Sequence, residues 1–171
     1  MKACVIFDTR YGNTEKIARS FEAGLHQAGI ETVCVNARDL TVDDSLVQYD
    51  LICIGAPTEW HTASKPMKAL LRNLKGIGLS GKCGFAFGTR FAAPLSGSAA
   101  KLIEKELKDR GILIIAPRES AIVAGAKGAV QGGWSASWNN SRSQGKDGSR
   151  IGITGSFLHG FEPVAPGNGG K

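Results

Sequence analysis

Five short apolar runs alternate with amphipathic helical segments along the first 125 residues, and this alternation limits the fold more than any other feature of the sequence. Each run is long enough for a strand that is buried on both faces. The expected strands cover residues 3–7, 32–35, 51–54, 83–87 and 112–116. Regular alternation of strands and helices predicts an α/β domain, in which a doubly wound, five-stranded parallel sheet lies between two layers of helices.

Apolar residues recur at helical spacing in three of the connecting segments. The first helix is expected to begin at Thr14 and end at Gly29, the second to begin after Ser64 as its N-cap, and the third to end at Gly111. Residues 43–48 carry only a weak helical pattern, and residues 121–124 are expected to extend or re-enter the sheet after Pro117. Ligands of such sheets bind beyond the carboxyl ends of the strands, so the loops after residues 7, 54 and 87 are the candidate binding loops.

Composition places the chain among ordinary globular proteins, with 42% apolar and 21% charged residues in a length of 171. No apolar run approaches the roughly 18 residues that a membrane helix needs. The N-terminus shows no cleavable signal pattern, so we expect a cytoplasmic protein with no membrane association.

The four cysteines, Cys4, Cys34, Cys53 and Cys83, each lie in an apolar run, and no two have C-x-x-C spacing. We therefore expect buried free thiols and no metal site. The net charge of +6 is spread along the chain and forms no basic run with interleaved aromatic residues. This pattern predicts no nucleic-acid binding and favours an acidic partner or an anionic ligand.

Residues 128–171 differ in composition from the rest of the chain. They contain 11 glycines and 6 serines, and no helical or strand period continues beyond a few positions. The domain is therefore expected to cover residues 1–127, with a flexible Gly/Ser-rich tail at 128–171. An alternative interpretation is a partner-binding segment that presents Trp134 and Trp138.

The loop after the first strand has the properties of an anion site. It reads Thr9, Arg10, Tyr11, Gly12, Asn13 and Thr14, and it leads directly into a helix. A helix N-terminus offers free N–H groups and partial positive charge, and the threonine hydroxyls can donate to phosphate oxygens. Glycine permits a close backbone approach, and asparagine tolerates unusual dihedral angles. The loop matches neither G-x-x-x-x-G-K-[ST] nor G-x-G-x-x-G, which disfavours a nucleoside triphosphatase or a nicotinamide site. The alternative is an ordinary polar turn between strand and helix.

Residues 5–20, VIFDTRYGNTEKIARS, resemble the phosphate loop of the flavodoxin family, whose pattern is Thr/Ser-x-Thr-Gly-x-Thr before a helix. Thr9, Gly12 and Thr14 match this pattern, and Tyr11 stands where threonine is commonest. Residues 55–61, GAPTEWH, resemble the G-[AS]-P-T flavin loop of the same family, and residues 88–97 occupy the position of its second flavin loop. The resemblance implies a three-layer flavodoxin-like fold with strand order 2-1-3-4-5, and FMN as cofactor.

The resemblance also implies which residues bind FMN. The phosphate is expected at Thr9, Arg10, Tyr11, Gly12, Asn13 and Thr14, and the flavin ring at Pro57, Thr58, Glu59, Trp60, His61, Thr89, Arg90 and Phe91. Trp60 could stack on the ring, or it could instead cap the core; His61 could be a surface residue. Arg90 and Lys65 near the flavin would favour its anionic reduced form, which predicts a less negative reduction potential than acidic flavodoxins have.

The function implied by the resemblance is electron transfer between redox partner proteins, with acidic partners favoured by the basic charge and no catalytic residue in the chain. The family's final amphipathic helix has no counterpart after Lys127, and the sheet that it would cover could then drive self-association into a homo-oligomer. Two alternatives remain open from the sequence. One is an FMN-dependent NAD(P)H oxidoreductase acting on quinones or similar acceptors, and the other is a non-redox binding module that has lost the flavin.

Overall fold

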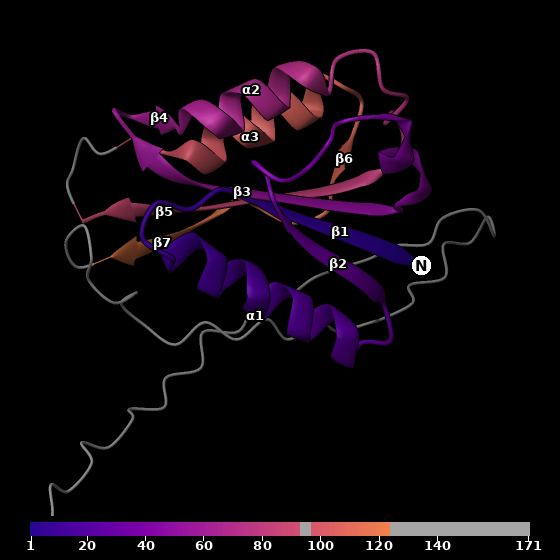
Figure 1. The fold of residues 1–171 in the computed structure, drawn as a ribbon, viewed down its shortest axis with the longest axis horizontal. Helices are drawn as coiled ribbons and strands as arrows, with labels where there is room; N and C mark the ends of the chain where they lie inside the picture. The colour runs from indigo at the N-terminus through magenta and orange to yellow at the C-terminus, as the bar shows by residue number, and fades with distance from the viewer. Residues whose placement is uncertain (93–96, 124–171) are drawn as a thin grey trace, which may run out of the picture.

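One sheet with helices on both faces makes up the part of the chain that the computed structural model describes, residues 1–92 and 97–123 (Figure 1). Its strands are β1 (Lys2–Phe7), β2 (Glu31–Asn36), β3 (Leu51–Glu59), β4 (Thr62–Ala63), β5 (Cys83–Phe91), β6 (Leu113–Ile114) and β7 (Glu119–Val123). Its helices are α1 (Asn13–Gln27), α2 (Lys65–Asn73) and α3 (Ala99–Lys108), together with a short 3-10 helix, η1 (Asp44–Gln48). The predicted α/β class is therefore confirmed.

The strand order along the sheet is β2-β1-β3-β5, and both β6 and β7 pair with β5 on its outer side. All of these pairs are parallel, whereas the two-residue β4 pairs antiparallel with the end of β3. Because β6 and β7 share one position, the sheet has the predicted order 2-1-3-4-5 with a divided last strand. Pro117 lies in the break, where its missing N–H removes no ladder hydrogen bond.

Helix α1 covers one face of the sheet, and α2 and α3 lie together on the other (Figure 1). Alternate residues of each strand enter different cores, as the strand geometry requires. In β1, Val5 and Phe7 pack with α1, whereas Cys4 and Ile6 pack toward α2 and α3. The buried parallel strands thus explain why the sequence shows continuous apolar runs instead of alternation.

The face below α1 contains an aromatic cluster. The Phe21 ring of α1 lies 5.3 Å from the Phe85 ring and 4.9 Å from the Phe87 ring, between centroids. Such aromatic pairs are worth about 0.5–1.5 kcal/mol each beyond the area that they bury. The cluster fixes α1, and therefore the loop before it, against the middle of the sheet.

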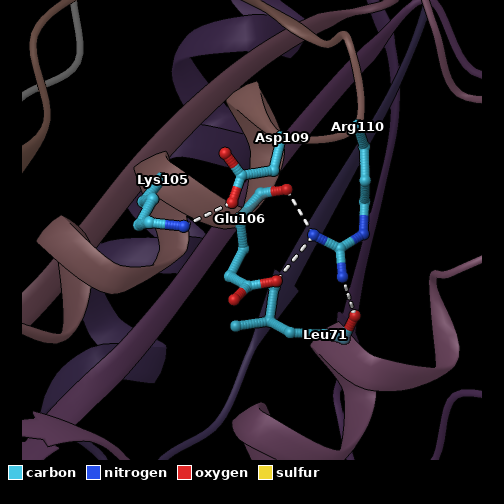
Figure 2. Close-up of polar contacts among 5 residues, drawn as sticks. All are labelled: Leu71, Lys105, Glu106, Asp109 and Arg110. Atoms are coloured by element: carbon cyan, nitrogen blue, oxygen red, sulfur yellow. Dashed lines mark hydrogen bonds and ion pairs between the residues drawn. The ribbon is translucent and has the colours of Figure 1, made fainter.

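Arg110 joins α2 to α3 on the opposite face (Figure 2). Its guanidinium donates to the Leu71 carbonyl of α2 and to both the carbonyl and the carboxylate of Glu106. The neighbouring ion pair joins Lys105, in the last turn of α3, to Asp109, the residue directly after the helix (Figure 2). The Arg110 bonds therefore tie the end of α3 to α2 on this face of the sheet.

Most element boundaries lie within two residues of those predicted, and the exceptions have a physical cause. β3 and β5 continue past residues 54 and 87, because the additional residues pair with each other, with β4 and with β7. The weak helical pattern at 43–48 is a 3-10 helix that Asp43 caps. Ser64 holds the predicted N-cap position of α2, but its hydroxyl makes no capping hydrogen bond.

The cysteines are unpaired thiols, as predicted, although only Cys4 and Cys53 are buried and the other two are half-buried. None of the helices among the described residues is long and apolar enough to cross a membrane. The predicted domain boundary at residue 127, the tail at 128–171 and its two tryptophans lie outside the described residues.

Candidate functional site

The three predicted binding segments meet at one cleft beyond the carboxyl ends of β1, β3 and β5. The cleft encloses about 620 Å³ of empty space when its open mouth is included. Its lining residues are Thr9, Arg10, Tyr11, Asn13, Thr14, Pro57, Thr58, Glu59, Thr89, Arg90, Phe91 and Val123. Neighbouring parallel strands end at the same edge of the sheet, which brings these distant segments together.

The first segment is a tight turn that leads into α1. Gly12 is the N-cap with φ of +83°, a left-handed conformation that glycine adopts without strain. The Gly12 N–H donates to the Thr9 hydroxyl oxygen at 2.9 Å, so the turn is closed by its own side chain. The N-cap of α1 makes no side-chain hydrogen bond. The N–H groups of Thr14 and Glu15 lie in the first turn, where no preceding helical carbonyl is available to accept from them. Asn13 is the first helical residue, and Gly12 alone takes the unusual dihedral angles of this turn.

A hydroxyl–hydroxyl bond connects the first and third segments. The Thr14 and Thr89 side-chain oxygens lie 3.0 Å apart in a buried position. Residues 89–91 are predicted as a loop but belong to β5, because they pair with β3 on one side and with β7 on the other. The bond therefore fixes the start of α1 to a strand inside the sheet. Because its partners are 75 positions apart in the sequence, no local pattern could have revealed it.

Asp8, the residue before the loop, supports the site although the sequence did not single it out. Its side chain is 1% exposed, and the Arg38 guanidinium donates to it at 2.9 Å. This bond raises the pKa of Arg38, so the partner keeps its charge. The Asp8 N–H also donates to the Gly55 carbonyl, which anchors the loop entrance to β3. In the sequence, this pair could have been suspected only from an acidic residue directly after β1 and a basic residue shortly after β2.

Trp60 and His61 form the tip of the hairpin between β3 and β4. Both have left-handed backbones, with φ of +47° and +67°, in a position where Asn-Gly is the usual sequence. The Trp60 side chain is 94% exposed, so the alternative in which it caps the core is wrong. Holding two bulky residues in this conformation costs about 1 kcal/mol or more each, which the surrounding contacts must offset.

Contacts to the entrance of α3 hold this hairpin at its base and at its tip. At the base, the Thr58 hydroxyl accepts from the Ala99 N–H at 3.0 Å. At the tip, His61 pairs with Gly97 in an isolated parallel bridge. Gly97 has φ of +69°, and a Cβ atom there would lie 2.3 Å from the His61 carbonyl oxygen. Only glycine permits this close approach.

Eleven of the fourteen predicted binding residues line the cleft, and the other three are Gly12, Trp60 and His61. Gly12 lies between lining residues, and the two hairpin residues follow Glu59 directly. Val123 lines the cleft but was not predicted, because the pairing of β7 with β5 could not be deduced from an apolar run. Lys65 does not line the cleft, whereas Arg90 and Arg10 do.

The residues present fit FMN. A phosphomonoester needs hydrogen-bond donors around an accessible backbone. Within the described part of the chain, no neighbouring atom lies within 4 Å of the position that a Gly12 Cβ would occupy. The lining charges are Arg10, Arg90 and Glu59, which leaves a positive balance for an anionic ligand. A flat apolar ring needs an aromatic surface, and Tyr11 and Phe91, which line the cleft, are each 45% exposed. Trp60 follows the lining residue Glu59 and is 94% exposed.

Comparison with known proteins agrees with this geometry. The family described as Flavodoxin matches residues 5–140. The chain belongs to the flavodoxin family. A flavodoxin of Clostridium saccharobutylicum is 29% identical over 116 residues, which are 67% of this chain and 72% of the relative. Family membership implies FMN as cofactor and electron transfer as the general chemistry of the domain, as the loops predicted.

Longer flavoproteins contain a similar segment. A putative diflavin flavoprotein of a Nostoc strain is 30% identical over 114 residues, covering 65% of this chain and 20% of the relative. A nitric oxide reductase of Moorella thermoacetica is 31% identical over 121 residues, covering 67% and 29%. The chain thus spans less than a third of these two relatives.

The fold agrees with a solved flavodoxin at the level of architecture. Flavodoxin 1 from Bacillus cereus superposes with a TM-score of 0.67 at 24% identity, over 73% of this chain and 86% of that one. Rubredoxin oxygen:oxidoreductase from Desulfovibrio gigas superposes with a TM-score of 0.61 at 20% identity, over 74% and 32%. At these identities the likeness concerns the fold alone.

Proposed function

We propose that the chain is a flavodoxin-type electron carrier that binds FMN in the cleft and exchanges electrons with redox partner proteins. The observation that carries the proposal is that a single cleft joins all three predicted binding segments. A site for the phosphate alone would need only the loop at the start of α1. The third segment instead supplies Arg90 and Phe91 from a different strand, which suits a ligand with an anionic end and an extended flat end.

The residues of the chain have distinct roles in this proposal. The Thr9 hydroxyl, whose oxygen already accepts from Gly12, keeps its own hydrogen for a phosphate oxygen, and the N–H groups at the start of α1 supply further donors. Trp60 would cover one face of the flavin ring, and the backbone around Pro57–Glu59 and Thr89–Phe91 would meet its polar edge. When bound, FMN supplies the redox chemistry, and the protein supplies orientation and charge.

Partners of acidic character are part of the proposal, because the cleft and the chain as a whole carry a positive balance. A place in a longer electron-transfer protein is compatible with the relatives that contain this segment. Self-association through the sheet remains a prediction that the size of the protein in solution would test.

The first experiment is the visible absorption spectrum of the purified protein, before and after FMN is added and the sample desalted. Retained flavin bands support the proposal, and a colourless protein overturns it. NADPH and NADH oxidation by the loaded protein should be negligible without a separate reductase. Rapid oxidation would instead favour the oxidoreductase alternative.

The phosphate role is tested separately by Thr9→Val, with Thr41→Val as a matched control at an exposed position. Loss of the Thr9 hydroxyl removes both the turn-closing acceptor and a phosphate donor, so FMN affinity should fall about tenfold. Riboflavin, which has no phosphate, should bind both variants as it binds the unmodified protein. Equal losses for FMN and riboflavin would show that Thr9 does not contact the phosphate.

A further inference from the structure

A second, shallow hollow begins where the hairpin ends, and we call it the α3 groove. Its charged and apolar wall consists of Lys101, Leu102, Lys105 and Lys108 from α3, Arg118 from the segment before β7, and His61 at the hairpin tip. Glu59 lines the flavin cleft and His61 lines the groove. The two sites are therefore only two residues apart along the same hairpin.

The outward charge of the groove is positive. Its two carboxylates, Glu104 and Asp109, are both engaged in ion pairs. The Glu104 side chain is 11% exposed and lies between Lys108 and Arg118, the latter at 2.9 Å. Four cations against these two carboxylates leave a balance of +2. Among the described residues, exposed Lys101 has no ion-pair partner, and it is the lysine nearest to the start of α3.

The spacing of the cations fits a protein surface better than a single phosphate group. From Lys101 to Lys108, α3 rises by about 10 Å, at about 1.5 Å per residue. Half-buried Leu102 packs against the core beside this row of lysines and adds apolar area to the groove, and Arg118 widens the charged area from another segment. Extended positive charge beside an apolar area is the complement of an acidic, partly apolar protein surface.

We propose that the α3 groove is the docking surface for an acidic redox partner protein. This inference rests on the proposed function, because it places that partner beside the flavin cleft through the hairpin that both sites share. Docking is non-covalent, and the electrons that one protein loses are those that the other gains. Lys101 steers the partner, whereas the Glu104 pairs hold α3 and the segment before β7 in place beneath it.

Binding of poly-L-glutamate to the full chain, with and without FMN, tests the surface directly. Lys101→Glu should weaken binding about fivefold at low salt, since reversing one charge at about 8 Å in water changes the interaction by that factor. An acidic residue in the first turn suits the start of a helix, so α3 is kept. The matched control is Lys75→Glu, an exposed position that changes net charge equally but does not line the groove. It should weaken binding less than twofold.

Electron transfer provides the second measurement, with a reduced acidic ferredoxin as the probe and the FMN-loaded protein as acceptor. The bimolecular rate should fall about fivefold in Lys101→Glu at low salt, and the difference should vanish near 1 M salt, where charges are screened beyond about 3 Å. Flavin affinity should be the same in both variants.

Equal effects of the two substitutions on binding and rate would overturn the groove proposal and leave the carrier function intact. A chain that binds no FMN would overturn the carrier function instead. In that case the poly-L-glutamate comparison on the flavin-free chain still decides whether the groove binds acidic chains.

Discussion

Replacing Gly97 with alanine should move the hairpin that carries Trp60, because the new methyl group has no room. The added Cβ would lie 2.3 Å from the His61 carbonyl oxygen and 2.4 Å from the His61 Cα. Both neighbours are backbone atoms, so no side-chain rotation can relieve the contact. Either Gly97 or the tip of the hairpin must shift by about 1 Å to restore an ordinary van der Waals separation.

The expected cost has two parts. A non-glycine residue at the observed φ of +69° costs about 1–2 kcal/mol. Overpacking against His61 adds about 1–3 kcal/mol, but release of the left-handed Trp60–His61 turn returns part of it. The free energy of unfolding should therefore fall by about 2–3 kcal/mol. If Trp60 covers the flavin ring as proposed, FMN affinity should fall about tenfold, because Trp60 would lose its fixed position.

Gly76→Ala is the matched control. Gly76 has φ of +92°, yet none of the described residues places a neighbouring atom within 4 Å of the position that its Cβ would take, so this variant has the backbone strain without the contact. Urea unfolding and FMN titration of both variants separate the two effects. Gly76→Ala should lose about 1–2 kcal/mol and keep its FMN affinity. If both variants lose equal stability and bind FMN equally well, the reasoning about the hairpin is refuted.

Four further predictions concern other charged or buried groups. Arg38→Gln should lower the free energy of unfolding more than Asp8→Asn does, because the first leaves a buried carboxylate without its partner; urea unfolding that shows the reverse order would contradict this. Hydrogen bonds from Lys108 and Arg118 hold the pKa of Glu104 below its usual value, so its contribution to stability is complete above about pH 4.3 and is lost as the pH falls through the lower folded-state pKa. Glu104→Gln should therefore lower the free energy of unfolding by about 1–2 kcal/mol at pH 7 and leave it unchanged at a pH below the folded-state pKa of Glu104. Thermal melting curves recorded at a series of pH values would measure this. Burial raises the pKa of the Cys53 thiol, and alkylation followed by mass spectrometry should label it only as fast as the protein unfolds; labelling at the rate of a free thiol would be inconsistent with this. Arg90→Gln should lower the potential of the fully reduced flavin by about 40 mV, roughly 1 kcal/mol for one electron, and an unchanged potentiometric titration would show that Arg90 does not act on the ring.

The sequence predicted those parts of the fold that depend on local patterns. The apolar runs located five strands, and the central ones, β1, β3 and β5, are buried as a continuous apolar signal predicts. The outer strands β2 and β6 are largely half-buried or exposed, because each has a neighbour on one side only. The sequence did not predict that β3 and β5 continue to Glu59 and Phe91, because these polar ends become strands only through pairing with β4 and β7. Strand propensity depends on neighbours that a single segment does not contain.

The candidate site was predictable in its segments and unpredictable in its connections. The phosphate loop and the two flavin segments appear in the sequence as turn residues after strands. The Thr14–Thr89 and Asp8–Arg38 bonds join residues that no local pattern relates. The left-handed Trp60 was equally hidden, because the turn carries neither asparagine nor glycine and its conformation is imposed from outside.

The source of that imposed conformation explains why two sites lie on one hairpin. Thr58 fixes the base of the hairpin to the Ala99 N–H, and Gly97 fixes its tip at His61, so both contacts come from the short segment Gly97–Ala99 at the entrance of α3. Ser98, between them, caps the same helix through the Lys101 N–H. A displacement of the start of α3 should therefore move both the Trp60–His61 turn and Lys101. If FMN binds in the cleft and the partner docks on α3, as proposed, the two events should be coupled through the entrance of one helix, and each should alter the affinity of the other by the same factor.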